Sequence, residues 1–173
     1  MDRRNLLLGG VGLLGGLWFF STGSSSEIDT EAVRAEFTER YNVMRRENDL
    51  PTVSTDEQLA RMAQEHAENM VEHDYTGHVQ PDGTDIEQRY RDENLLPQCE
   101  LPAGAGRVYR GAEVATSVPS SYADSDEDVA EFTLEVWMAS QPHREVMVIP
   151  EIEAIGLGVA EENGEIRAAL KFC

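Results

Sequence analysis

Hydrophobic residues recur every three to four positions in three long stretches of the chain, which is the spacing of one face of an α-helix. The first stretch begins after Asp29, a potential N-cap, and ends near Asn48. The second follows the capping-box sequence 54–57 and runs to Met70, and the third follows Ser125. For the third helix we expect an apolar face, flanked by Trp137, that consists of Val129, Phe132, Val136 and Ser140.

Shorter apolar runs in the second half of the chain are typical of β-strands, and they cover residues 108–116, 152–160 and 166–172. Asn163-Gly164, between the last two, is the most common two-residue hairpin signal. A short helix is expected at 84–90, capped by Thr84, and 94–106 is expected to be a loop. The order of these elements lacks βαβ alternation and therefore predicts an α+β fold, with helices covering a small antiparallel sheet.

The first 26 residues have a different composition from the rest. Arg3 and Arg4 precede an uncharged apolar stretch, 6–20, and small polar residues follow, which is the order found in export signals. A helix of residues 6–20 would span about 22 Å, less than the ~30 Å hydrocarbon core, so a retained anchor is the second interpretation. We predict an export signal or N-terminal anchor at 1–26 and one domain at 27–173. This domain would be extracellular or held at the outer face of the membrane.

The charge of the chain is strongly negative, with 33 acidic and 14 basic residues and a net charge of −19. Such a chain is repelled by a nucleic-acid backbone, which excludes DNA and RNA as partners. Only Lys171 is a lysine, and acidic residues are spread along the whole chain. This composition is typical of proteins in molar salt, where the Debye length is roughly 3 Å, and predicts a halophilic source such as a halophilic archaeon. The alternative is an acidic mesophilic protein.

Cys99 and Cys173 are the only cysteines in a chain that carries an export signal. Outside the reducing cytosol they are expected to form a disulfide that fixes the C-terminal strand. Two buried free thiols remain the alternative, because spacing alone does not establish that the cysteines are close together.

Three residues are candidates for a shared metal or acid/base site. His78 lies in a polar turn, and His143 follows Pro142 at a helix start for which Ser140 is the expected cap. Glu113 lies within an apolar strand, where a carboxylate is costly unless it is paired or ligating. Taken singly, each has an ordinary explanation as a solvated side chain. His66 lies on the apolar face of the second predicted helix, and we interpret it as structural.

Several short motifs occur in a fixed order along the chain. They are Asn42-x-x-Arg45, Leu50-Pro51-Thr52-Val53, Asp56-x-x-Leu59-Ala60, Gly77-His78-x-x-Pro81-Asp82-Gly83, Trp137-x-x-Ser140-x-x-His143-Arg144 and Gly156-Leu157-Gly158-Val159-Ala160. From about residue 28 to 173 the chain thereby resembles the CAP superfamily in its compact prokaryotic form. Cysteine-rich secretory proteins, antigen 5 and plant pathogenesis-related proteins share this domain. The resemblance implies a three-layer α-β-α sandwich.

The resemblance also implies a cleft lined by two histidines and two acidic residues, which holds a divalent cation in some family members. His78 and His143 match the two histidines, and Glu113 matches the first acidic position. At the second acidic position this chain offers Ser140 and no carboxylate. The implied metal site is therefore His78, Glu113 and His143, a ligand set suited to zinc with an open position. Val146 replaces an asparagine usual in the family, so we expect weaker binding.

These features predict an extracellular CAP-domain module that binds a divalent metal, a lipid or another envelope component in the cleft, without established catalysis. An unidentified small molecule is a further possible partner, and membrane anchoring would use residues 6–20. The alternative is a metal-dependent hydrolase in which metal-bound water is the nucleophile. The sequence offers no obvious second general base for such an enzyme. A third possibility is a structural surface domain stabilised by salt.

Overall fold

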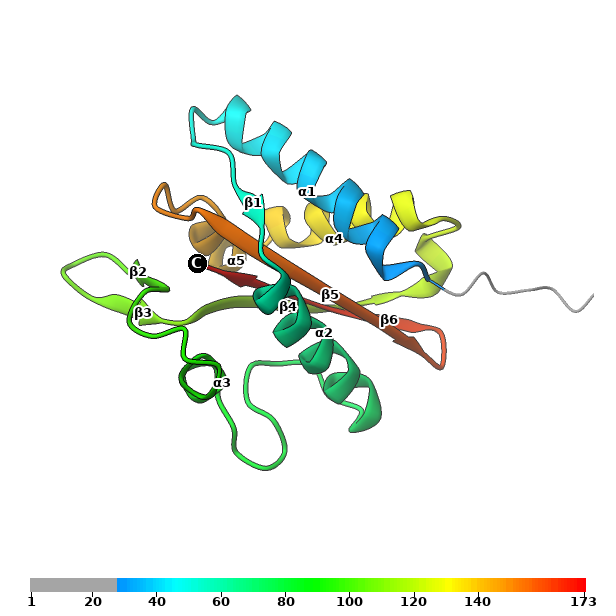
Figure 1. Ribbon diagram of the computed structural model, residues 1–173. Coiled ribbons are helices and arrows are strands. Elements are labelled where there is room, and N and C mark those ends of the chain that lie inside the picture. The colour runs from blue at the N-terminus through cyan, green and yellow to red at the C-terminus, as the bar shows by residue number, and fades with distance from the viewer. Residues whose placement is uncertain (1–27) are drawn as a thin grey trace, which may run out of the picture.

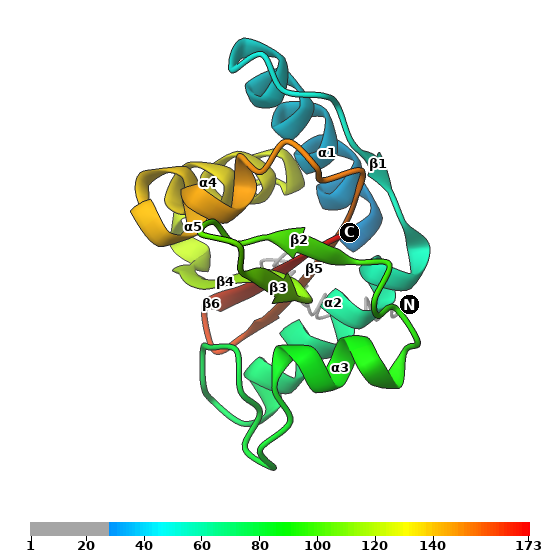
Figure 2. The same ribbon diagram turned by 90° about the vertical axis from the view of Figure 1, so that its left-hand side faces the viewer.

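A computed structural model describes residues 28–173, so the predicted export segment lies outside the described residues. The helices are α1 (Thr30–Glu47), α2 (Glu57–Glu72), α3 (Ile86–Asp92), α4 (Asp126–Ala139) and α5 (Gln141–Met147), with a 3-10 turn at Ser120–Tyr122. Helices α1, α4 and α5 cover one face of the central sheet and α2 and α3 lie on the other (Figures 1 and 2). The predicted three-layer sandwich is confirmed. In the part of the chain described, no helix has the length and apolarity needed to cross a membrane.

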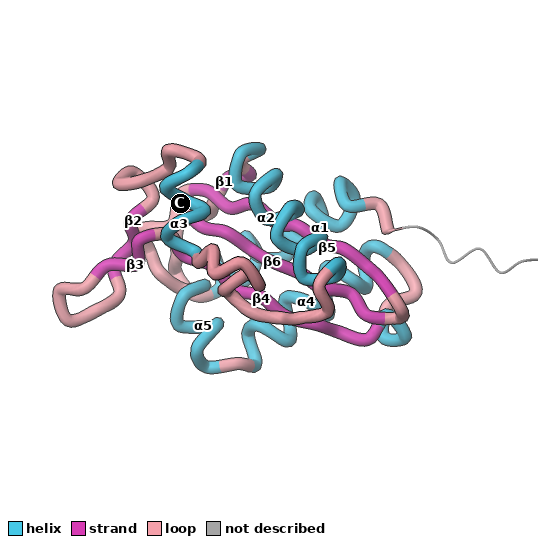
Figure 3. The backbone as a smooth tube through the Cα atoms, turned by 90° about the horizontal axis from the view of Figure 1, so that it is seen from below, coloured by secondary structure: helices cyan, strands magenta, loops and turns pink. Residues whose placement is uncertain are grey.

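The central sheet has four strands in the order β1-β5-β6-β4. These are β1 (Ser54–Thr55), β4 (Ala112–Pro119), β5 (Ala154–Glu162) and β6 (Glu165–Phe172). The sheet is mixed rather than purely antiparallel, because β1 pairs with β5 in parallel. A separate ribbon of β2 (Glu100–Pro102) and β3 (Val108–Arg110) extends beyond the end of the sheet (Figures 1 and 3). The stretch 94–106, predicted to be a loop, therefore contains a strand.

Helix starts follow the local sequence with three exceptions. Helix α2 is capped by Asp56, whereas the capping box predicted at 54–57 would begin at Ser54, and Ser54 and Thr55 instead form β1. Asp29 caps α1 and Ser125 caps α4, both by accepting backbone N–H groups as expected. Helix α3 is capped by Asp85 rather than Thr84. Ser140 precedes α5, but its side chain makes no capping hydrogen bond. These local errors shift element boundaries without changing the fold.

The buried face of α4 is offset from the predicted one. The predicted members Phe132 and Val136 are only half-buried, whereas Trp137 is fully buried. The Trp137 ring meets Phe37 of α1 edge-on, with ring centroids 5.6 Å apart. Because α4 packs against α1 as well as the sheet, its buried face consists of Val129, Ala130, Thr133 and Trp137. The hydropathy pattern did not reveal this face, because two of its residues, Ala130 and Thr133, are small or polar.

Two glycines of β5 allow α2 to lie directly on the sheet. A Cβ atom on Gly156 would be 2.1 Å from the backbone nitrogen of Ala60, and one on Gly158 would be 2.2 Å from that of Gln64. The Gln64 side chain also donates to the carbonyl of Val159 at 2.9 Å and accepts from its N–H at 3.1 Å. The two glycines of the Gly-x-Gly motif are thus needed for α2 to pack this close to β5.

The Asn42 and Arg45 motif fixes the loops beyond α1. Asn42 donates to the carbonyl of Val53 at 3.0 Å and accepts from its N–H at 2.8 Å. Arg45 is completely buried and donates to the carbonyls of Pro51 at 2.6 Å and Met147 at 3.1 Å. A buried guanidinium is tolerated here because backbone oxygens surround it.

The predicted disulfide is confirmed: Cys99 is bonded to Cys173, with Cα atoms 4.3 Å apart. It joins the residue after β6 to the segment just before β2, across a separation of 74 residues. The chain-entropy estimate for a loop of this length is about 4 kcal/mol of stabilisation.

Candidate functional site

Glu113 is the centre of a buried polar cluster. It is the second residue of β4, and its register partner in the antiparallel pair with β6 is Lys171. Both side chains have no exposed surface. Alternation along β4 directs Glu113 to the sheet face that α2 and α3 cover, so helical residues reach it as well.

Four basic side chains contact the Glu113 carboxylate. Arg89 of α3 donates to both oxygens, at 3.0 Å and 2.9 Å. Lys171 donates to Oε2, and His78 Nδ1 lies 2.9 Å from Oε1. His66 Nε2 donates to the carbonyl of Gly77 and lies 3.4 Å from the same Oε1. The expectation that a carboxylate in this strand must be paired is confirmed.

Electrostatics keep this carboxylate ionised. Burial by itself raises the pKa of Glu113, but Lys171, His66, His78 and Arg89 outweigh burial and hold that pKa well below its usual value. A deprotonated carboxylate has no hydrogen to donate, so Nδ1 of His78 is the donor in their hydrogen bond. Among the described residues no hydrogen bond to Nε2 of His78 is found, and the side chain is 42% exposed.

His143 lies on α5 at the outer side of this cluster. Burial and the nearby charge of His78 lower the pKa of His143. Its Nδ1 is buried and has no hydrogen-bond partner among the described residues. The structure therefore brings His78 and Glu113 into contact, and the link of His143 to them is the effect of His78 on the pKa of His143. Glu113 accepts a hydrogen bond from His78, and none from His143 is found in residues 28–173.

The residues present do not fit a zinc site that uses Glu113. Lys171 and Arg89 already contact its two oxygens, so a divalent ion there would face two cations at close range. In the described part of the chain, no group of three or more His, Cys, Asp or Glu residues is arranged to hold a metal ion. Metal uptake by the protein itself stays a prediction.

Sequence reasoning missed Arg89 and Lys171 and placed His66 outside the site. His66 is structural in being fully buried, yet it touches Glu113. One signal was available for Lys171: the only lysine of the chain lies in an apolar strand, where an ammonium needs a partner. Arg89 carries no comparable signal, because an arginine on a short helix is ordinarily solvated.

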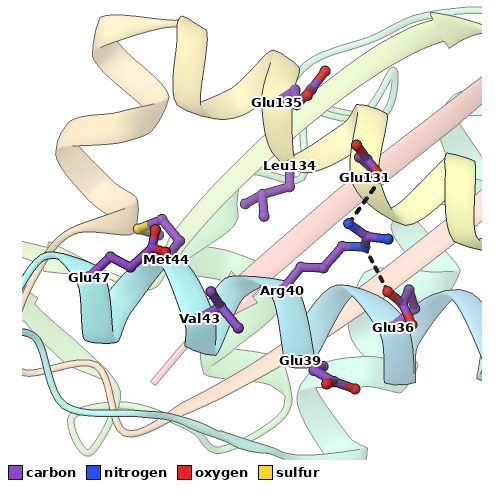
Figure 4. Close-up of a pocket in the computed structure, with 9 residues that line it drawn as sticks. All are labelled: Glu36, Glu39, Arg40, Val43, Met44, Glu47, Glu131, Leu134 and Glu135. Carbon is purple, nitrogen blue, oxygen red and sulfur yellow. Dashed lines mark ion pairs between the residues drawn. The ribbon is translucent and has the colours of Figure 1, made fainter.

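Two of the cavities in the described structure lie on opposite sides of the sheet. One, of about 300 Å³, lies beside the Glu113 cluster and is lined by Met62, Glu65, His66, Gln80, Thr84, Arg89, Asp92 and Glu93. The other, of about 430 Å³, is a groove between α1 and α4. Figure 4 shows Arg40 in this groove, paired with Glu36 and Glu131 at 2.7 Å and 3.0 Å, beside the apolar residues Val43 and Leu134.

The three-layer fold and the His/Glu cluster on its sheet define a small α-β-α sandwich domain. The family model described as CAP, cysteine-rich secretory protein family, matches residues 38–169. The chain therefore belongs to this family, as the resemblance implied. No curated protein sequence matches the chain.

Solved structures share this fold at low sequence identity. An outer surface protein from Borrelia burgdorferi has a TM-score of 0.61 and 17% identity, covering 82% of this chain and 91% of its own. An extracellular protein with an SCP domain from Bacillus anthracis has a TM-score of 0.57 and 19% identity, covering 82% of this chain and 40% of its own. The structure of NaASP2 with Zn²⁺ has a TM-score of 0.58 and 15% identity, covering 85% and 82%.

Proposed function

We propose that this protein is an extracellular CAP-domain module that binds its ligand without catalysis. The ligand contacts the imidazole pair of His78 and His143 through a polar group, carried by a small molecule, a lipid or another envelope component. The observation that carries this proposal is a difference in exposure within the cluster: the Glu113 carboxylate is buried, whereas the His78 imidazole is exposed. Glu113 has no exposed side-chain surface, whereas the His78 side chain is 42% exposed.

Binding is favoured over hydrolysis because the cluster offers no free carboxylate base. A general base must reach the proton that it abstracts, and Glu113 is enclosed by the cations that pair with it. The metal-dependent hydrolase requires Glu113 as a metal ligand, and two basic side chains oppose that role. Zinc in the structure of NaASP2 is a property of that protein.

The proposed location outside the cytoplasm has three supports. The first residues have the order of charge and apolarity found in export signals. Two similar structures are those of an outer surface protein and an extracellular protein. The disulfide that joins Cys173 to Cys99 is also typical of proteins in an oxidising environment.

The test is to identify what copurifies with the folded protein. We would incubate the purified protein with an envelope extract of its source, re-isolate it and analyse bound molecules by untargeted mass spectrometry for lipids, small molecules and metals. The variants are His78→Ala and His143→Ala, and the matched control is His73→Ala, an exposed histidine that makes a hydrogen bond to Asn69 and none to Glu113.

The wild type and His73→Ala are expected to retain the same molecule, and the two site variants should retain at least about tenfold less. Circular dichroism would confirm that all four proteins are folded. Equal retention by all four would refute the site. Turnover of generic ester or peptide substrates that is abolished by chelator would instead establish the hydrolase.

A further inference from the structure

The Glu113 carboxylate has used up its capacity to accept. An ionised carboxylate has about four lone-pair sites. Oε1 faces Arg89 at 3.0 Å, His78 at 2.9 Å and His66 at 3.4 Å. Oε2 faces Arg89 at 2.9 Å and also accepts from Lys171. These five contacts leave no lone pair directed at a further ligand.

The position of Lys171 follows from the sheet rather than from a flexible side chain. Lys171 and Glu113 are register partners on β6 and β4, so their Cβ atoms leave the sheet side by side on one face. The ammonium is enclosed and also lies 5.7 Å from the ring centroid of Tyr90 on α3. A lysine built into the sheet in this way holds its amine beside Glu113 in every folded molecule.

We propose that Lys171, assisted by Arg89, is a resident cation that replaces a divalent metal ion at Glu113. The cluster is thus a metal-independent junction that joins β4, β6, α2, α3 and the turn at 77–83. Its net charge is +1 when both histidines are neutral, from two cations and one carboxylate. A divalent ion would raise that local charge further in a buried site, where charges are poorly screened. This inference does not depend on which ligand the imidazole pair binds.

The first experiment measures metal dependence directly. Thermal denaturation of the wild type would be followed with chelator and with one equivalent of zinc, in parallel with Glu113→Gln. We expect the wild-type midpoint to change by less than about 1 °C in both conditions, since no ion binds at Glu113. A zinc-dependent rise in the wild type that is lost in Glu113→Gln would overturn the proposal. A rise of equal size in both proteins would mean that zinc binds elsewhere, without Glu113, and would still support the proposal.

The second experiment tests the pairing itself with a double-mutant cycle. Glu113→Gln leaves two buried cations, Lys171 and Arg89, with no carboxylate, and should lower the midpoint by at least about 6 °C. Lys171→Met keeps Glu113 paired with Arg89 and should cost less. The double variant should be more stable than Glu113→Gln, because it leaves one buried cation without a carboxylate instead of two.

A control variant, Glu131→Gln, breaks an exposed ion pair to Arg40 and should shift the midpoint by less than about 3 °C. If a single variant does not fold, a folded double variant is itself the rescue. A double variant no more stable than Glu113→Gln would overturn the proposal.

Discussion

Substituting Gly158 by alanine tests the packing of α2 on β5, which positions His66 and the rest of the cluster. The added Cβ would lie 2.2 Å from the carbonyl carbon of Ala63 and from the backbone nitrogen of Gln64. Ordinary carbon contacts begin near 3.5 Å, so the helix has to move by more than about 1 Å. The atoms in the way are backbone, and no rotamer change relieves them.

The expected cost is set by overpacking. Inserting a methyl group into a closely packed interface costs about 1–3 kcal/mol, and displacement of α2 also strains the two hydrogen bonds between Gln64 and Val159. We therefore expect a loss near 3 kcal/mol. For a domain of this size that corresponds to about 6–12 °C in the thermal midpoint.

The assay is thermal and urea denaturation followed by circular dichroism, with Gly77→Ala as the matched control. A Cβ on Gly77 meets no atom within 4 Å, and its backbone does not require a positive φ, so this variant should be close to neutral. The urea midpoint of Gly158→Ala should fall with an unchanged slope. If Gly158→Ala were within about 0.5 kcal/mol of Gly77→Ala, the reasoning about this interface would be wrong.

Three further outcomes follow from the same structure. Arg45→Met should lose about 3 kcal/mol, because buried carbonyls lose their donor, while exposed Arg46→Met should be neutral in the same urea titration. The pKa of His143 in the folded protein is lowered from 6.5, so just below pH 6.5 the unfolded chain binds more protons than the folded one. The free energy of unfolding should therefore fall as the pH drops below 6.5, and it should fall less steeply in His143→Gln. With a net charge of −19, the thermal midpoint should drop on dialysis from molar salt to tens of millimolar; a flat midpoint would favour an acidic mesophilic protein.

The elements were predictable wherever neighbours along the chain decide them. Asp29 and Ser125 are capping residues because their side chains reach backbone N–H groups two or three positions away. The Asn163-Gly164 hairpin is equally local, and both residues have a positive φ. The face of α4 was not predictable, because Trp137 is buried by α1, a helix about 90 residues earlier in the chain.

The same distinction between local and distant contacts applies to the candidate site. Strand context identified Glu113 as a carboxylate in need of a partner, whereas the expectation that His78 and His143 lie near it came from the family resemblance. The sequence did not identify the partner, since Arg89 and Lys171 are 24 and 58 positions away from Glu113. Only the pairing of β4 with β6 and the placement of α3 bring these cations together. Glu113, predicted to be a metal ligand, is thereby the buried counter-ion of Arg89 and Lys171. Local patterns record short-range hydrogen bonding and periodicity, whereas a buried charge is settled by whichever distant groups the fold places within a few ångströms of it.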